Sequence, residues 1–368
     1  MITGASGNVG TSVVAALAED ERVGSMLGLA RREPTWSAAK LTWATADIGI
    51  DELDGHLAGA DAVVHLAWLF QPTHDPVVTW RNNVLGAIKV FEAAGRAGVP
   101  ALVYSSSVGA YSPGPQHEPV DESWPTHGWP GAAYCREKAY LERWLDGFEA
   151  THPDTRVVRI RPAFLFKRES ASEQRRLFAG PLLPGMLVRR GLVPAVPDVT
   201  GLRFQALHTD DAAQAFRLVL HRDVRGAFNI AADPVIDGRV LAELLHARRV
   251  PLPPGALRLP LAAAWRMRLV PASPDLFDAV LRLPIMDSTR ARTELGWAPR
   301  RTATEALEEL LAGLREGAGL ATPPLASRVR GGRLRELLGN GAGVGAGRAD
   351  VGGAEVASGG GAETGERA

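Results

Sequence analysis

Apolar runs and amphipathic stretches alternate along the first 110 residues. Short apolar runs at residues 25–30, 62–66 and 101–104 predict buried strands. Apolar positions at helical spacing predict helices at residues 9–18 and near 84–97. A helix between two strands carries the chain back to the same end of a sheet, so the strands run parallel. The pattern therefore predicts an α/β fold with a doubly wound parallel sheet.

The composition of the chain changes after residue 161, because prolines recur from there on. We expect a sheet domain over residues 1–161 and a smaller C-terminal substrate lobe over residues 162–320, with segments that return to the sheet. Residues 321–368 form a tail. From about residue 339 the tail is rich in Gly and Ala and has almost no large apolar side chain, so it cannot offset the entropy cost of folding. We expect that part to be disordered.

Composition and charge exclude several classes of function. Lys and Arg number 41 and Asp and Glu number 41, so no overall field attracts nucleic acid or an anionic membrane. The most apolar stretch, residues 58–70, is shorter than the roughly 18 to 20 residues of a membrane span. One cysteine, Cys135, and no secretion leader predict a cytoplasmic protein. The histidines form no ligand spacing, and we expect no metal site.

A glycine turn opens the first predicted helix. Gly4, Gly7 and Gly10 stand three residues apart, where glycine permits a sharp turn, close approach to a pyrophosphate and tight helix packing. The start of the helix, at Asn8 and Val9, offers unpaired N–H groups that favour negative charge. The turn therefore predicts a Rossmann-type dinucleotide site. Because it begins at the third residue, either the first strand is shortened or the start codon has been placed too late.

The end of the second predicted strand indicates which dinucleotide binds. An acidic residue there would bind the ribose 2′-hydroxyl of NAD, whereas an arginine can hold the 2′-phosphate of NADP. The sequence is Leu29-Ala30-Arg31-Arg32, with Glu33 just beyond. Arg31 therefore favours NADP. NAD stays the alternative, because in an arginine-rich chain Arg31 could also be a solvated surface residue with no role in binding.

Three side chains predict proton-transfer chemistry. Tyr134 and Lys138 stand four residues apart and share one face of a predicted helix. A phenol with a pKa near 10 is a poor acid or base at neutral pH, and an ammonium group beside it favours the phenolate. Ser107 follows a buried strand, at the end where ligands of open α/β sheets bind. Its hydroxyl could hold the oxygen of a substrate.

In order and spacing, these motifs resemble the extended short-chain dehydrogenase/reductases, the NAD-dependent epimerase/dehydratase family. The likeness covers about residues 1–315. The further segments that carry it are Ala46-Asp47-Ile48, His65-Leu66-Ala67, Asn83-Val84-Leu85-Gly86, Arg161-Pro162, His208-Thr209-Asp210-Asp211, Asp287-Ser288-Thr289-Arg290 and Leu295-Gly296-Trp297.

The resemblance implies a role for each matching residue. Tyr134 would be the acid or base, Lys138 would lower its pKa, and Ser107 would hold the reacting oxygen. Asn83 would support a proton relay. The implied cofactor site consists of Gly4, Gly7, Asn8, Val9 and Gly10 at the pyrophosphate, Arg31 at the ribose, Asp47 and Ile48 at the adenine, Leu66, Ala67 and Pro162 along the cleft, and Tyr134 and Lys138 at the nicotinamide ribose.

Three functions are compatible with these residues. The first is an NAD(P)-dependent oxidoreductase that moves a hydride between the nicotinamide and a secondary alcohol or ketone carbon of a small, sugar-like or other hydroxy or keto compound. The second is a nucleotide-sugar epimerase or dehydratase with tightly held NAD. The third is a non-enzymatic dinucleotide-binding sensor, which the retention of Ser107, Tyr134 and Lys138 disfavours. A homodimer is an expectation from the resemblance alone.

The stretch after Pro162 bears on the substrate. Family members that act on nucleotide sugars often carry an asparagine there, whereas this chain has apolar residues, which counts against a UDP-sugar. Arginines nearby could still clamp a diphosphate, although most arginines in such a chain are solvated. They are Arg168, Arg175, Arg176, Arg189, Arg190 and Arg203.

Overall fold

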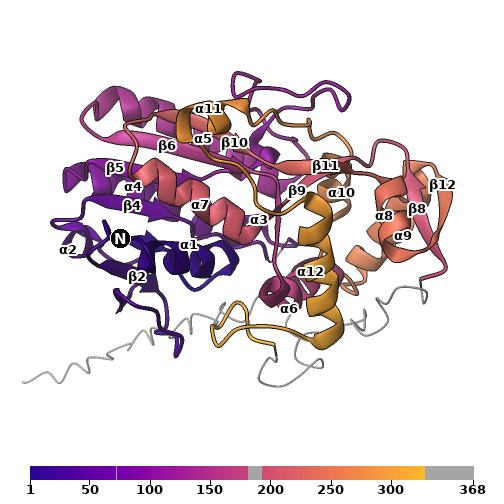
Figure 1. Cartoon of the computed structure of the whole chain (residues 1–368), viewed down its shortest axis with the longest axis horizontal. Coiled ribbons are helices and arrows are strands. Elements are labelled where there is room, and N and C mark those ends of the chain that lie inside the picture. The colour runs from indigo at the N-terminus through magenta and orange to yellow at the C-terminus, as the bar shows by residue number, and fades with distance from the viewer. Residues whose placement is uncertain (72, 181–192, 328–368) are drawn as a thin grey trace, which may run out of the picture.

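The structure is a computed structural model and describes residues 1–71, 73–180 and 193–327. A seven-stranded parallel sheet forms its centre, in the order β10-β6-β5-β4-β1-β2-β3 (Figure 1). Its strands are β1 (Ile2–Thr3), β2 (Met26–Ala30), β3 (Leu41–Thr45), β4 (Ala62–His65), β5 (Ala101–Ser105), β6 (Arg156–Pro162) and β10 (Gly226–Ile230). The predicted α/β fold with a doubly wound parallel sheet is confirmed.

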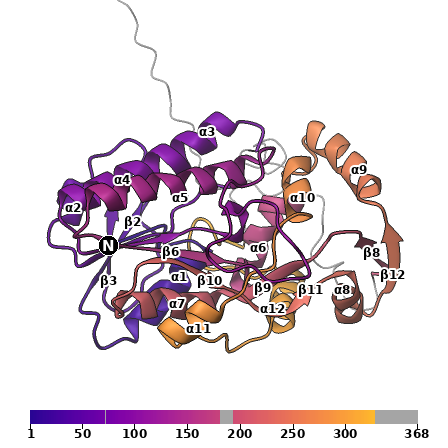
Figure 2. The ribbon, with the colours of Figure 1, turned by 90° about the horizontal axis from the view of Figure 1, so that it is seen from above.

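Helices cover both faces of this sheet (Figure 2). One face carries α1 (Asn8–Ala18), α7 (Thr209–Leu220) and α11 (Thr289–Leu295), and the other carries α2 (Asp54–Leu57), α4 (Gly86–Arg96) and α5 (Ala133–Thr151). Adjacent strand residues point to opposite faces, so Val63 packs into the core beneath α4 and α5 and Val64 into the core beneath α1 and α7. Burial on both faces explains why these strands read as continuous apolar runs.

The predicted elements of the first half match the structure closely. The helix expected at residues 9–18 is α1. The helix expected near 84–97 begins earlier, as a π-helical turn at Arg81–Leu85 that leads into α4. The strand before the glycine turn, β1, has two residues and still pairs with both β2 and β4.

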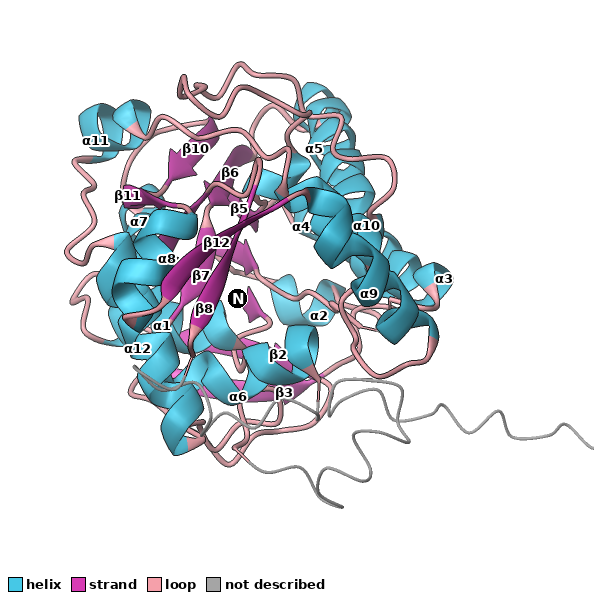
Figure 3. Ribbon diagram, turned by 90° about the vertical axis from the view of Figure 1, so that its right-hand side faces the viewer, coloured by secondary structure: helices cyan, strands magenta, loops and turns pink. Residues whose placement is uncertain are grey.

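The second half of the chain builds the part to the right in Figure 1 and also returns to the main sheet as β10. Its small sheets hold β7 (Phe164–Phe166), β8 (Ala195–Val199), β9 (Phe204–His208), β11 (Ala232–Ile236) and β12 (Arg248–Leu252). Its helices are α6 (Ala171–Gln174), α8 (Gly238–Leu245), α9 (Pro254–Arg266), α10 (Pro274–Val280) and α12 (Ala303–Glu316), and Figure 3 looks onto this side. The expected disorder from about residue 339 lies outside the described residues.

The remaining short helices lie in connections. They are α3 (Pro76–Trp80) and the turns Val108–Ala110, Arg168–Ser170 and Arg175–Ala179. Within the described ranges, no helix is both long and apolar enough to cross a bilayer.

Contacts that only glycine permits close the turn between β1 and α1. Gly4 has a φ of +70°, and a Cβ on it would lie 2.6 Å from the Ala67 backbone nitrogen. A Cβ on Gly10 would lie 2.2 Å from the Gly4 carbonyl oxygen. Gly7 differs, because its nearest neighbour would be 3.4 Å away. Close packing therefore requires glycine at positions 4 and 10. At position 7, the missing side chain leaves space in front of the helix.

We expect Gly10→Ala to lower the free energy of unfolding by about 3 kcal/mol, because the added methyl overlaps rigid backbone. Gly147, exposed on α5 with no atom near its missing Cβ, is the matched control. Gly147→Ala should stabilise the protein by about 0.5–1 kcal/mol. Urea denaturation measures both values. Equal stabilities of the two variants would show that the turn is not tightly packed.

Candidate active site

A cleft of about 570 Å³ opens at the carboxyl ends of the central strands. Every residue that the sequence singled out for catalysis or cofactor binding lines it: Gly4, Gly7, Asn8, Val9, Gly10, Arg31, Asp47, Ile48, Leu66, Ala67, Asn83, Ser107, Tyr134, Lys138 and Pro162. Trp68, from the loop after β4, also lines it. Residues that are as far apart in the sequence as Gly4 and Pro162 thus line the same cleft.

The start of α1 suits an anion. Its N-cap is Gly7, which supplies no capping side chain, and its first turn has no acidic residue. The first N–H groups, at Asn8 and Val9, therefore have no side-chain acceptor from the cap and face the cleft. The Asn8 side chain holds the helix start in place through Leu165 and Thr209. This glycine cradle and helix end fit the pyrophosphate of a dinucleotide.

The other end of the cleft lies beyond β2. Arg31 and Arg32 follow this strand with exposed side chains. Asp47 accepts a hydrogen bond from its own loop, at Gly49, and Ile48 lies beside it. An adenosine and its ribose would fit here, on the side of the glycine turn away from Tyr134.

Ser107, Tyr134 and Lys138 meet at the ends of β5 and α5. The Ser107 Oγ accepts a hydrogen bond from the Gly109 N–H at 2.9 Å. The Ser107 Oγ and the edge of the Tyr134 ring lie side by side at Gly109, because a Cβ on this glycine would come within 3.4 Å of both. The Lys138 Nζ donates to the Ser105 carbonyl at 2.7 Å. It also lies 3.5 Å from the centre of the Trp68 ring. The serine and the phenol form one pair, and the ammonium group sits behind it.

Burial controls the titration of this group. It raises the pKa of Tyr134, although the nearby Ser107 hydroxyl acts the other way. It also places the pKa of Lys138 well below its ordinary value, against the attraction of Glu137 and Glu142. Burial is the first cause of the raised pKa of Tyr134, so the phenol is protonated at neutral pH. The lowering of this pKa by Lys138 stays a prediction.

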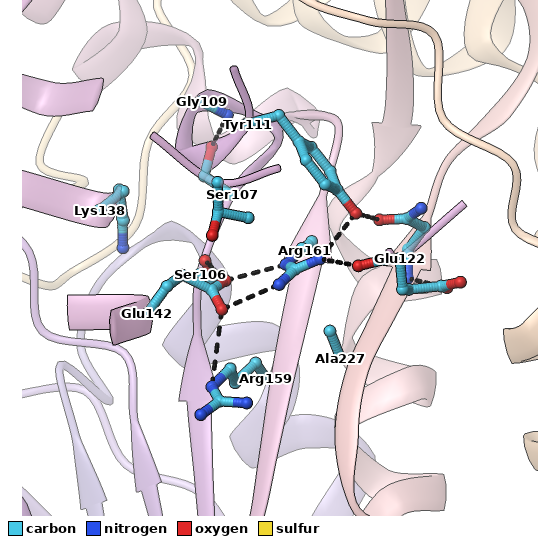
Figure 4. Close-up of polar contacts among 12 residues, drawn as sticks. Ser106, Ser107, Gly109, Tyr111, Glu122, Lys138, Glu142, Arg159, Arg161 and Ala227 are labelled. Atoms are coloured by element: carbon cyan, nitrogen blue, oxygen red, sulfur yellow. Dashed lines mark hydrogen bonds and ion pairs between the residues drawn. The ribbon is translucent and has the colours of Figure 1, made fainter. Parts of the chain in front are cut away.

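A buried polar network lies directly behind Ser107 (Figure 4). The Glu142 carboxylate accepts two hydrogen bonds from Arg161, at 2.9 and 3.0 Å, and one from Ser106. Burial alone would raise the pKa of Glu142, but the hydrogen bonds and charge of Arg161 bring it below the ordinary value. Arg161 also donates to the Tyr111 hydroxyl at 2.8 Å. The network fixes α5 against β6 and the end of β5.

Asn83 has a defined structural partner. Its amide pairs with both backbone groups of Leu69, at 2.7 and 2.9 Å, and donates to the Glu137 carboxylate at 2.7 Å. It thereby holds the loop whose Trp68 and Phe70 rings contact Tyr134. The proton-relay role of Asn83 stays a prediction, since these bonds engage its whole amide.

Sequence reasoning missed several residues of the cleft and its surroundings. Glu137 and Glu142 are buried carboxylates on α5, and only their places just before Lys138 and four residues after it could have drawn attention to them. Phe70 and Phe178 reach the cleft from loops or short turns with no periodic pattern. No local signal in the sequence marks these two aromatic residues.

Comparison with known proteins identifies the family. The model of the NAD dependent epimerase/dehydratase family matches residues 1–231, so the chain belongs to that family. A ketoreductase of a farnesylated dihydroquinoline oxide from Stigmatella aurantiaca is 27% identical over 330 residues, covering 84% of this chain and 94% of the relative. An uncharacterized protein of Mycobacterium tuberculosis is 26% identical over 242 residues, 63% of this chain. The chain spans 59% of that relative's length.

Solved structures resemble the fold. A UDP-glucose 4-epimerase from Thermus thermophilus, in complex with NAD, superposes with a TM-score of 0.64 at 19% identity. The alignment covers 85% of this chain and 98% of that one. At this level of identity, the likeness supports the fold alone.

His65 lies at the end of β4, beneath the glycine turn. Its Nδ1 shares a hydrogen bond of 2.8 Å with the Thr3 hydroxyl, and its Nε2 is buried without a partner among the described residues. Burial, and next the charge of Lys138, lowers the pKa of His65 to about 3. The histidine therefore stays neutral in the folded protein when an unfolded chain would protonate it.

Acid should destabilise the protein through His65. Above pH 6.5 the ring is neutral in both states, and between pH 6.5 and about 3 only the unfolded state binds the proton. In that window we expect the free energy of unfolding of the natural chain, relative to His65→Gln, to fall by about 1.4 kcal/mol per pH unit. Urea titrations at several pH values should show that the stability difference between the natural chain and His65→Gln changes with pH across this window. A difference that stays constant from pH 7 to pH 4 would contradict the prediction.

Proposed function

We propose that this chain is an NAD(P)-dependent oxidoreductase that interconverts a secondary alcohol and a ketone. The observation that carries the proposal is the placement of Ser107 and Tyr134 next to each other in the same cleft as the glycine turn. The ketoreductase relative, which aligns over most of both chains, supports it. A sensor that only binds a dinucleotide would need neither the serine nor the tyrosine.

The dinucleotide, when bound, supplies or accepts the hydride. Gly4, Gly7 and Gly10 would hold its pyrophosphate, and Lys138 would bind the ribose next to the nicotinamide. Ser107 holds the carbonyl oxygen of the substrate, while Tyr134 gives its proton to that oxygen as the carbon is reduced. Ketone, proton and reduced dinucleotide become alcohol and oxidised dinucleotide.

Burial raises the pKa of Tyr134, so the proton that the reductive step needs is on the phenol at neutral pH. The oxidative direction uses the same groups with the proton moving the other way. A homodimer and a cytoplasmic location stay predictions.

We expect Tyr134→Phe to reduce turnover by about 10²–10⁴-fold, the usual contribution of a general acid, and to leave dinucleotide affinity nearly unchanged. The matched control is Tyr140→Phe, since Tyr140 lies on the same helix and is 42% exposed. Loss of dinucleotide absorbance with ketone substrates measures turnover, and fluorescence titration measures affinity. Activity of Tyr134→Phe within tenfold of the natural chain would rule out the phenol as the proton donor.

NADP is the proposed dinucleotide, because Arg31 follows β2 at the cleft and can hold a 2′-phosphate. We expect Arg31→Asp to weaken NADPH binding by at least tenfold while NADH binding changes little. The exposed Arg266→Asp carries the same change of charge far from β2 and should alter neither. Titrations with both dinucleotides decide the point. Equal losses of NADPH and NADH affinity in Arg31→Asp would contradict the preference.

A further inference from the structure

The part of the cleft beyond Tyr134 is walled by apolar side chains from separate segments. We call it the apolar chamber: Phe70 from the loop after β4, Leu177 and Phe178 from the turn Arg175–Ala179, Leu261 from α9, and Leu276 and Phe277 from α10. The Phe70 ring stacks on Tyr134 with centres 4.9 Å apart and meets Phe178 at 5.7 Å. The apolar wall is therefore continuous with the reacting hydroxyl.

Specific side-chain contacts hold the walls of the apolar chamber together. Arg258 joins α9 to α10 through a bond of 2.8 Å to Asp278. Trp265 of α9 donates to Thr73 at 2.9 Å and stacks on His74, which ties α9 to the loop after β4. A preformed apolar pocket with a few polar groups is the usual form of a site for a small molecule.

Within the described ranges, the cleft offers no cation to a diphosphate in the chamber. The cationic side chains that line the cleft are Arg31, Arg32 and Lys138. The two arginines lie beyond β2, and the Lys138 ammonium is already bonded to Ser105 and covered by Trp68. A nucleoside diphosphate would have to leave its phosphates without a charged partner, at a large cost.

The arginines that the sequence offered for a diphosphate have other partners. Arg168 pairs with Glu316, and Arg203 donates to the Gln116 carbonyl. Arg176 donates to the carbonyls of Pro324 and Ala326. Arg175 donates to the Gly180 carbonyl, and none of these four lines the cleft. Arg189 and Arg190 lie outside the described residues.

Glu173 places a carboxyl group in the same wall. It lines the cleft beside Gln174, on the segment that also presents Leu177 and Phe178. Burial raises the pKa of Glu173 to about 7, although Arg176 and Lys167 act the other way. The group would repel a phosphate when ionised and could donate a hydrogen bond to a neutral oxygen when protonated.

We propose that the apolar chamber takes an uncharged ketone with a large hydrocarbon body, aromatic or branched, and does not take a nucleotide sugar. This inference rests on the proposed function, because the ketone carbon must reach the place that Ser107 and Tyr134 define. The chamber then holds the hydrocarbon part and leaves the carbonyl oxygen at the hydroxyl pair.

The test uses the full chain, NADPH and three probe ketones of growing apolar size: cyclohexanone, acetophenone and 2-acetylnaphthalene. We expect kcat/KM to rise by about tenfold or more with each step, because apolar surface fills the chamber. UDP-glucose should not compete with 2-acetylnaphthalene, and it should not be oxidised when NADP⁺ or NAD⁺ replaces NADPH. Turnover of UDP-glucose, competition by it, or a kcat/KM that does not rise with ketone size would overturn the proposal.

Paired variants test the wall itself. Leu261→Ala should lower kcat/KM for 2-acetylnaphthalene by about tenfold and leave the NADPH dissociation constant unchanged. Leu259→Ala is the control on the same helix, because Leu259 is 70% exposed and does not line the cleft. Leu276→Ala gives a second wall variant should Leu261→Ala fold poorly. Identical kinetics in the wall variants and the control would contradict the proposal.

Failure of the chamber and failure of the proposed function give different results. Equilibrium binding of 2-acetylnaphthalene to the protein is measured without turnover, by quenching of tryptophan fluorescence. Binding of this ketone without any hydride transfer from NADPH would leave the chamber standing and refute the oxidoreductase function. NADPH oxidation with small polar ketones, together with no binding of 2-acetylnaphthalene, would support the oxidoreductase function and refute the apolar chamber as the substrate site.

Discussion

The buried ion pair of Glu142 and Arg161 governs the arrangement of the active site. Tyr134, Lys138 and Glu142 stand at successive intervals of four residues on α5, so they share the face that meets the strand ends. Removing either partner would leave an unpaired charge in the protein interior, which costs several kcal/mol. The pair therefore holds α5 in one rotation about its axis. That rotation brings the phenol to Ser107, whose neighbour Ser106 bonds to the same carboxylate.

The two ends of the cleft differ in charge. Around Tyr134, burial favours the neutral forms of the phenol and of the lysine. At the glycine turn, N–H groups without a capping side chain point into the cleft and carry a partial positive charge. Among the described residues of the cleft, the groups that could bind an anion therefore lie at the helix end and beyond β2, and the walls beyond Tyr134 carry mainly apolar side chains.

The sheet and most of the site could be predicted because their signals are local. Strands buried on both faces give apolar runs, the glycine turn has a fixed spacing, and Tyr134 and Lys138 are a helical pair. What could not be predicted depends on long-range packing. The contact of Asn83 with Leu69 and Glu137 joins a π-helical turn, a loop and α5, and no spacing in the sequence reveals it. The pKa of Tyr134 likewise depends on how deeply the ring is buried, which the motif does not encode.

The arginines near the expected substrate position also show that the local sequence does not reveal long-range contacts. The sequence offered six arginines that could clamp a diphosphate, although most arginines in such a chain are solvated. The four of them that the structure describes donate to backbone carbonyls or pair with a surface carboxylate, as Arg176 and Arg168 do. An arginine can bind a ligand only where its guanidinium group is not already bonded to other groups of the protein. Among the described residues of the cleft, Arg31 and Arg32 meet that condition beyond β2. The proposed phosphate contacts therefore lie at one end of the cleft and the proposed hydrocarbon contacts at the other.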